Sequence, residues 1–233
     1  MPRTLNLLSA GAAQGLVKAL QPAFEQRQGC RLDARFGAVG AMKEALLAGA
    51  ACDLMVLSDS LVDSLVADGR LRADARAPLG RVRTGIAVPS GSHRPDVSTP
   101  EALRAALLAA DAVFFPDPQR ATAGIHFAGV LDTLGVQQTL HPRLRPFPNG
   151  ATAMGEMARA GLPGAIGCTQ VTEILYTDGV ELVAVLPPQF ELATVYTAAV
   201  ATGAREPELA AQLLALLSAP AQQALRRAGG FED

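Results

Sequence analysis

Four short turns rich in small and polar residues hold the groups in this chain that could bind an anion. They cover residues 9–14, 37–40, 117–126 and 148–151, and each one opens a helical pattern. The first N–H groups of a helix lack intrahelical partners, and the helix dipole adds partial positive charge there. A strand, a small-residue turn and a helix start therefore form a cradle for an anionic group. The alternative at each turn is an ordinary, tightly packed connection between a strand and a helix.

The third turn carries the side chains with the clearest chemistry. Arg120 offers a charge partner for an anion, and Thr122 offers a hydroxyl donor. His126 sits in the first turn of the helix that follows. Two alternatives stay open, because Arg120 could equally be a solvated loop residue and His126 a surface or capping histidine.

Composition excludes several other kinds of site. The chain has 233 residues, of which 49% are hydrophobic and 18% charged, with a formal net charge of -2. Its Lys and Arg residues are scattered, so we expect no nucleic-acid partner. Cys30, Cys52 and Cys168 form no C-x-x-C pair, and the histidines also lack metal-ligand spacing. Because no phosphate-binding fingerprint is present either, we expect no metal and no cofactor.

The elements that position the first two turns alternate in type. Strands are predicted at about 5–10, 30–36 and 52–57, and helices at about 11–28, 41–47 and 59–67. Pro22 predicts a kink or a break in the first helix, and Ser58 is placed to cap the third. This β-α-β-α-β-α order favours a parallel sheet with helices on both faces.

Beyond residue 80 the pattern changes. Residues 81–89 alternate and end in Pro-Ser-Gly-Ser, which predicts a strand that leaves the first sheet and enters a second one. Thr99 or Ser98 is placed to cap a helix that starts at Pro100. Further strands are predicted at about 113–115, 143–147, 164–168, 180–185 and 195–201. Further helices are predicted at about 100–110, 126–134, 152–159, 169–175, 206–217 and 219–227.

The order of these turns resembles the molybdate-binding periplasmic protein family. The likeness covers nearly the whole chain and is carried by residues 7–24, 36–46, 51–54, 117–134 and 165–170, with Ala123-Gly124-Ile125 among its most specific pieces. It implies an α/β fold of the type II solute-binding class. In that fold two lobes, each a mixed sheet flanked by helices, face each other across a ligand cleft. The resemblance implies lobe one at 1–83 and 197–233, and lobe two at 84–196.

The same resemblance implies the ligand residues, and several of the family's hydroxyl donors are replaced here. The family's two serines fall on Ala12 and Val39, its tyrosine falls on Cys168, and its backbone donor falls on Ala123. Each lost donor costs a tetrahedral oxyanion about 1–3 kcal/mol, which disfavours molybdate. The remaining polar groups suit an organic di- or tricarboxylate, which arginine can hold with two parallel hydrogen bonds. They are Ser9, Gln14, Arg35, Arg120, Thr122, His126, Asn149, Thr169 and Gln170, with the backbone N–H groups of Gly11, Gly40 and Ala123.

Two functions of different classes follow. The first is a monomeric solute-binding protein that closes on a small anion, with an ABC transporter permease as a candidate partner. The second is an enzyme, because the resemblance extends to aconitate isomerases, which move a proton along a tricarboxylate on this fold. His126 is then the candidate acid or base, with Glu173 or Cys168 behind it.

The start of the sequence bears on location. No secretory signal precedes the first strand, and no apolar run approaches the ~20 residues that span a membrane. We therefore expect no membrane insertion. The location is expected to be periplasmic if a leader has been removed, and cytoplasmic otherwise.

Overall fold

The computed structural model describes residues 3–233, which form two compact units. Unit 1 comprises the described residues up to Val82 together with Thr194–Asp233, and unit 2 comprises Arg83–Ala193. The chain passes from unit 1 to unit 2 within β4 (Leu71–Pro89) and returns at the start of β9 (Ala193–Ala201). The sequence-based division had placed these passages at 83/84 and 196/197.

Unit 1 is built on a sheet with the strand order β2-β1-β3-β9. β1 runs parallel to both β2 and β3, which confirms the predicted β-α-β-α-β order, while β9 runs antiparallel to β3. The elements are β1 (Arg3–Ala10), the 3-10 turn η1 (Gly11–Ala13), α1 (Gln14–Gln28), β2 (Cys30–Gly37), α2 (Val39–Leu47), β3 (Leu54–Ser58), α3 (Asp59–Ala67), α9 (Pro207–Ser218), the 3-10 turn η4 (Pro220–Gln222) and α10 (Gln223–Ala228).

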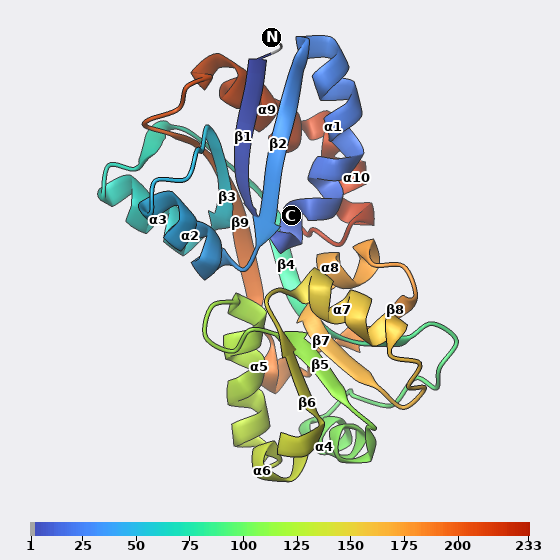
Figure 1. The fold of residues 1–233 in the computed structure, drawn as a ribbon. Helices are drawn as coiled ribbons and strands as arrows, with labels where there is room; N and C mark the ends of the chain where they lie inside the picture. The colour runs from blue at the N-terminus through green and yellow to red at the C-terminus, as the bar shows by residue number, and fades with distance from the viewer. Residues whose placement is uncertain (1–2) are drawn as a thin grey trace. The chain divides into compact units, whose positions relative to one another are not determined.

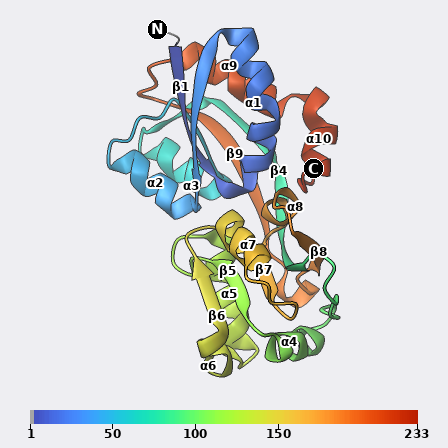
Figure 2. The ribbon, with the colours of Figure 1, turned by 45° about the vertical axis from the view of Figure 1, so that its right-hand side comes forward.

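Helices cover both faces of the sheet of unit 1. In Figures 1 and 2, α1 and α9 lie over one face, and α2 lies over the other with α3 beside it. Because β1, β2 and β3 are parallel, Ala10, Gly37 and Ser58 end their strands at the same edge of the sheet. The helices α1, α2 and α3 all start from this edge.

A buried carboxylate fastens the opposite end of β3. Asp53 is 1% exposed and accepts hydrogen bonds from the backbone N–H and side-chain amide of Asn6, at 2.7 and 2.8 Å. It also accepts from the N–H groups of Arg205 and Glu206, at 2.6 and 3.1 Å. Burial raises the pKa of Asp53, but these hydrogen bonds outweigh burial and hold its pKa below the usual value. Asp53 therefore ties together β1, β3 and the start of α9.

Unit 2 is built on a second mixed sheet with the strand order β8-β4-β7-β5-β6. β5 runs parallel to β6 and β7, whereas β4 runs antiparallel to β7 and β8. The elements are α4 (Pro100–Ala109), β5 (Val113–Pro116), α5 (Thr122–Thr133), α6 (Gln137–Leu140), the 3-10 turn η2 (His141–Arg143), β6 (Leu144–Phe147), α7 (Gly150–Arg159), β7 (Ile166–Gln170), α8 (Val171–Tyr176), β8 (Val180–Val185) and the 3-10 turn η3 (Pro188–Phe190).

Alternating residues of this sheet contribute to two apolar clusters, one on each face. The α5-side cluster joins Ile86, Phe115 and Cys168 to residues of α4 and α5. The α7-side cluster joins Ala87, Phe114 and Ala165 to residues of α7 and α8. Neighbouring residues of a strand point to opposite faces, so the face that each side chain occupies can be read from its position in the strand.

Several predicted boundaries differ from those observed. α1 continues through Pro22, and both Pro22 and Lys18, whose carbonyl loses its usual helical donor, are exposed to water. β4 starts at Leu71, ten residues before the predicted strand, and its first residues alternate charged side chains with alanine. Thr99 does cap α4, accepting from the N–H of Ala102 at 3.1 Å. Ser58, by contrast, makes no side-chain cap for α3.

Candidate functional site

Two helix starts at the edge of the sheet of unit 1 offer free backbone donors. Ala10 precedes η1, which leads into α1, and Ala38 precedes α2. Neither start has a side-chain cap, and neither has an acidic residue in its first turn. Ala10 and Gly37 are register partners in adjacent parallel strands, so the two starts are neighbours. Together they can hold an anionic group through backbone N–H groups.

The predicted residues of unit 1 gather at these two starts. Gly11 and Ala12 are buried within η1, and Gln14 is the first residue of α1. Val39 and Gly40 form the first turn of α2, whereas the prediction placed them in the preceding turn. A helical start suits donation by their N–H groups even better than a turn, since the N–H groups of a first helical turn point along the axis.

Two other polar groups of unit 1 fit an anion site less well. Ser9 is fully buried and donates its hydroxyl to the Ala10 carbonyl at 2.9 Å, so its hydroxyl is already engaged. The start of α3 carries Asp59, which accepts a hydrogen bond from Thr197 at 2.6 Å. A carboxylate at that helix start repels an anion. Arg35 is exposed on β2.

In unit 2 the start of α5 is the matching feature. Thr122 and Ala123 are its first two residues, Ala121 supplies no side-chain cap, and the first turn has no acidic residue. Gly124 packs so closely that an added Cβ would overlap the carbonyl oxygens of Pro116 and Asp117. This contact sets the first turn of α5 against the carboxyl end of β5, where ligands of open α/β sheets bind.

The loop before α5 and the histidine within it have defined partners. One Asp117 carboxylate oxygen accepts from the N–H groups of Gln119 and Arg120 at 2.7 and 3.2 Å, and Arg120 is exposed in this turn. His126 lies one turn after Thr122, on the same helical face. Its Nε2 is 2.7 Å from the Phe190 carbonyl oxygen. A carbonyl only accepts, so Nε2 carries the proton and Nδ1 is the acceptor of a neutral ring.

The fourth predicted turn is filled by the protein's own carboxylate, which corrects the expectation for Asn149. The Asn149 side chain caps α7, accepting from the Thr152 N–H at 2.8 Å. The carboxylate of Glu173 packs on Gly150, where an added Cβ would overlap it. Burial raises the pKa of Glu173, while hydrogen bonds from Thr169 and from the N–H groups at the start of α7 act against that rise. An external anion finds this helix start occupied.

Thr169 belongs to the same internal arrangement. Its hydroxyl donates to Glu173 at 2.6 Å, and an added Cβ at Gly150 would also overlap it. Thr169 is thus committed to the α7 side of the sheet and does not face the α5 start. Glu173 shares that side, which corrects the expectation that it stands behind His126.

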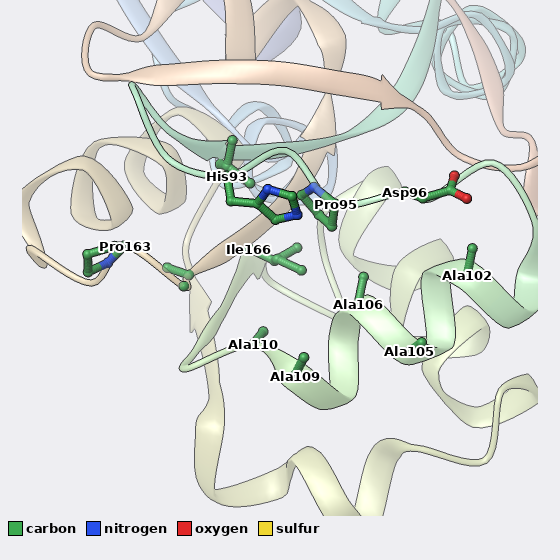
Figure 3. Close-up of a pocket in the computed structure, with 13 residues that line it drawn as sticks. His93, Pro95, Asp96, Ala102, Ala105, Ala106, Ala109, Ala110, Pro163 and Ile166 are labelled. Carbon is green, nitrogen blue, oxygen red and sulfur yellow. The ribbon is translucent and has the colours of Figure 1, made fainter.

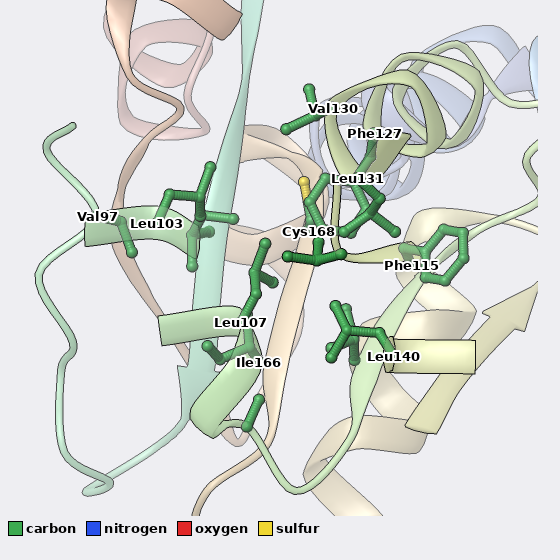
Figure 4. Close-up of a cluster of buried hydrophobic side chains, with 14 of the residues drawn as sticks. Val97, Leu103, Leu107, Phe115, Phe127, Val130, Leu131, Leu140, Ile166 and Cys168 are labelled. Atoms are coloured by element: carbon green, nitrogen blue, oxygen red, sulfur yellow. The ribbon is translucent and has the colours of Figure 1, made fainter. Parts of the chain in front are cut away.

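The structure also corrects the expectation for Cys168. Its side chain is fully buried in the α5-side cluster among Phe127, Val130 and Leu131, as Figure 4 shows. Burial raises the pKa of its thiol well above the ordinary value, so it stays protonated and inert. Cys168 supports the fold and offers neither a ligand hydroxyl nor a base.

Among the predicted site residues, Gln170 is the one whose side-chain amide is buried without any hydrogen-bond partner. It ends β7 and is 2% exposed, and neither its amide oxygen nor its amide nitrogen has a hydrogen-bond partner. Thr84, its register partner on β4, is 1% exposed and also has an unpartnered hydroxyl. Thr84 is not among the residues predicted from the sequence. The available signal was a hydroxyl on the strand face that Ile86 and Val88 otherwise fill with apolar side chains.

A separate hollow in unit 2 does not suit an anion. It has a volume of about 450 Å³ and is lined by Ala102, Ala106 and other alanines of α4, with Pro163 and Ile166 opposite (Figure 3). Its lining lies at the amino end of β7, the reverse of the edge where Gln170 lies. His93 and Asp96 are its ionisable lining residues.

Residues 3–233 hold neither a cluster of metal-ligating side chains nor a helix that could span a membrane. No group of three or more His, Cys, Asp or Glu residues in this range is arranged to hold a metal ion. No helix in the same range is long and apolar enough to cross a membrane.

Comparison with known proteins shows that this chain is similar to bacterial solute-binding proteins and to an isomerase. Residues 5–232 match the family described as bacterial extracellular solute-binding protein. An aconitate isomerase of Pseudomonas sp is 28% identical over 92% of this chain and 82% of its own length. The molybdate-binding protein of Escherichia coli is 25% identical over 82% of this chain and 76% of its own length. The periplasmic molybdate-binding protein of Azotobacter vinelandii has a similar structure, with a TM-score of 0.78 at 18% identity, covering 98% of this chain and 99% of its own.

Proposed function

Since the chain belongs to the bacterial extracellular solute-binding protein family, and its fold is that of the type II periplasmic binding proteins, we propose that it binds a small organic di- or tricarboxylate. The ligand lies at the helix starts that follow the parallel strands. One carboxylate is held by the N–H groups at η1 and α2 in unit 1. The start of α5 in unit 2 offers uncapped N–H groups of the same kind.

The observation that carries this proposal is the kind of donor present. The starts of η1, α2 and α5 are uncapped and free of acidic first-turn residues, yet they bring no side-chain hydroxyl at Ala12 or Val39. Backbone N–H groups and the nearby Arg120 suit the two oxygens of a carboxylate. A tetrahedral oxyanion needs partners on all four oxygens.

The missing donors disfavour molybdate. Three hydroxyl donors implied by the family resemblance are replaced by Ala12, Val39 and Cys168, and the Cys168 sulfur is buried in the apolar cluster. At about 1–3 kcal/mol for each unpaired partner, their loss weakens oxyanion binding by about two to six orders of magnitude. The start of α7, which already holds Glu173, adds no replacement donor.

The rest of the function is proposed by extension from the family. The protein passes its ligand to an ABC transporter permease, resides in the periplasm and acts as a monomer.

A thermal-shift screen tests the ligand class. Succinate, citrate and tricarballylate are compared with molybdate, tungstate and sulfate at equal concentration and ionic strength. A ligand that binds only the folded state raises the melting temperature. We expect the carboxylates to raise it and the inorganic oxyanions to leave it unchanged. A clear rise with molybdate and none with any carboxylate would overturn the proposal.

A second candidate function is an aconitate-type isomerase, favoured by the geometry of His126. Its Nε2 donates to Phe190, which fixes the ring and leaves Nδ1 as a base. Such a base takes a proton from the methylene carbon of the substrate and returns it to the far carbon of the allylic system. The double bond moves, and no atom is gained or lost. The Pseudomonas relative carries the name of this activity.

Incubation with cis- and trans-aconitate, followed by NMR, tests this candidate. Interconversion above the uncatalysed rate supports it, and its absence removes it. Full activity in a His126→Ala variant would remove the role given to His126 while keeping the activity.

A further inference from the structure

Two unsatisfied polar side chains, Gln170 at the end of β7 and Thr84 beside it on β4, point to the chemistry of the ligand. Gln170 is 2% exposed, and its amide has neither its two donors nor its acceptor paired. A buried amide without partners costs free energy comparable to several lost hydrogen bonds. Native proteins rarely keep such a group unless something else satisfies it.

The face that Gln170 occupies is fixed by the strand. Gln170 lies two residues after Cys168, so both side chains are on the α5 side of the sheet. On the neighbouring strand, Thr84 lies two residues before Ile86 and is therefore on the same side. The Thr84 hydroxyl is also unpartnered. Two orphaned polar side chains thus stand opposite each other on paired strands.

The surroundings of this pair come from unit 2 itself. The uncapped start of α5 follows the carboxyl end of β5, which runs parallel to β7. The segment 190–192 lies next to both Thr84 and α5. The Thr84 N–H donates to the Leu192 carbonyl at 3.0 Å, and His126 of α5 donates to the Phe190 carbonyl at 2.7 Å. Gln170 and Thr84 therefore lie beside a helix start that can hold an anion.

We propose that Gln170 and Thr84 bind a hydroxyl group of the ligand, so that the natural ligand is a hydroxy-carboxylate. This inference rests on the proposed function. An ionised carboxylate only accepts hydrogen bonds, so it can satisfy the amide nitrogen of Gln170 but leaves the amide oxygen unpaired. A hydroxyl group donates once and accepts twice. It can donate to the Gln170 oxygen while accepting from the Gln170 nitrogen or the Thr84 hydroxyl.

An ammonium group is the other donor that a small anion could carry, and the charges nearby disfavour it. Asp117 lies in the loop before α5, and its Oδ1 accepts from the N–H groups of Gln119 and Arg120. Glu173 is bound on the opposite face by Thr169. A hydroxyl group suits this polar but uncharged pair better than a cation does.

Calorimetry with matched ligand pairs tests the inference. Malate and succinate differ by one hydroxyl group, as do citrate and tricarballylate, and aspartate replaces the hydroxyl of malate by an ammonium group. The wild-type protein is expected to bind each hydroxy acid about tenfold to a hundredfold more tightly than its deoxy partner. The Gln170→Leu variant should bring this ratio close to one while still binding the deoxy acids. Thr84→Val should lower the ratio in part, and Gln138→Leu, at an exposed glutamine of α6, should leave it unchanged.

The unliganded proteins give a second readout that does not depend on binding. Gln170→Leu removes an unpaired buried amide, so its melting temperature without ligand should equal or exceed that of the wild type. Equal affinity within both pairs, full discrimination retained by Gln170→Leu, or a preference for aspartate over malate would overturn the inference and leave the proposed function standing. Failure of all five acids to bind would overturn the proposed function, and the inference with it.

Discussion

Replacing Glu173 with glutamine should change the way in which the free energy of unfolding depends on pH. The Glu173 carboxyl is buried at the start of α7, where it accepts a hydrogen bond from Thr169. Burial raises its pKa in the folded protein above the unfolded value of about 4.3. A raised carboxyl pKa contributes stability that is fully present below the unfolded pKa. That stability is lost as pH rises through the folded pKa.

The size of the effect follows from this linkage. Between the unfolded and the folded pKa, the wild-type protein loses at most about 1.4 kcal/mol of stability per pH unit from this group. The side chain of the Glu173→Gln variant is uncharged at every pH, so this variant does not lose that stability as pH rises. Its stability relative to wild type should therefore rise as pH increases from 4 towards 8.

Urea unfolding at several pH values between 4 and 8 measures this difference. Glu156→Gln is the matched control, because Glu156 lies on α7 with a side chain 41% exposed beside Arg159. Its pH profile should run parallel to the wild-type profile, since exposed pairs contribute little. If the Glu173→Gln profile also runs parallel to wild type, burial does not raise the pKa of Glu173, which would refute this reasoning.

A third variant tests whether the start of α7 can bind a free anion once the Glu173 carboxylate is removed. Glu173→Ala leaves the Thr169 hydroxyl and the N–H groups at the start of α7 without their acceptor, which should cost about 1–3 kcal/mol for each group that stays unpaired. Formate is small enough to replace the lost carboxylate and should restore part of this loss. Equal stabilisation of Glu156→Ala by formate would refute a specific effect.

Three further predictions concern the close packing at Gly124, the buried carboxylate of Asp53 and the role of His126. Gly124→Ala should lose about 1–3 kcal/mol of unfolding free energy, because its Cβ would overlap the carbonyls of residues 116 and 117. Gly129→Ala, on the same helix with open space around it, should gain up to about 1 kcal/mol in the same assay. Asp53→Ala should lose about 1–3 kcal/mol near neutral pH for each of the Asn6, Arg205 and Glu206 donors that stays unpaired. That loss should shrink as pH falls below about 4, because the lowered pKa of Asp53 stabilises the fold only above the unfolded value. His126→Asn should abolish any aconitate isomerisation measured by NMR but leave succinate binding within about tenfold; unchanged turnover would exclude His126 as the base.

The strands and helix starts of unit 1 could be predicted from the sequence because each signal is local. An apolar run such as Leu54–Ser58, followed by a helical pattern, defines a βα unit without reference to distant residues. The start of β4 could not be predicted, since residues 72–78 hold only alanine and proline between their charged residues and are mostly exposed. Alanine gives only a weak strand signal, and no large apolar side chain marks a buried face here.

The candidate site was predictable only in part, because its remaining determinants are tertiary contacts. The small residues at 11, 12 and 40 marked the helix starts directly. The occupation of the α7 start depends on Glu173, which is 23 positions after Gly150 and reaches it from another helix. The burial of Cys168 comes from its packing against side chains of α4 and α5, which are tertiary contacts that the local pattern does not show. Thr84 can be assigned to the site only from its pairing with Gln170, which the sequence alone does not give.

Titration calorimetry of the wild-type protein with citrate and with molybdate, at the same pH and ionic strength, tests the proposed ligand class most directly. We expect citrate to bind in a saturable way and molybdate to bind at least about a hundredfold more weakly, because three hydroxyl donors are missing. Tight, saturable binding of molybdate without heat from citrate, malate or succinate would show that backbone donors alone suffice for a tetrahedral oxyanion. That result would contradict the assignment of a carboxylate ligand.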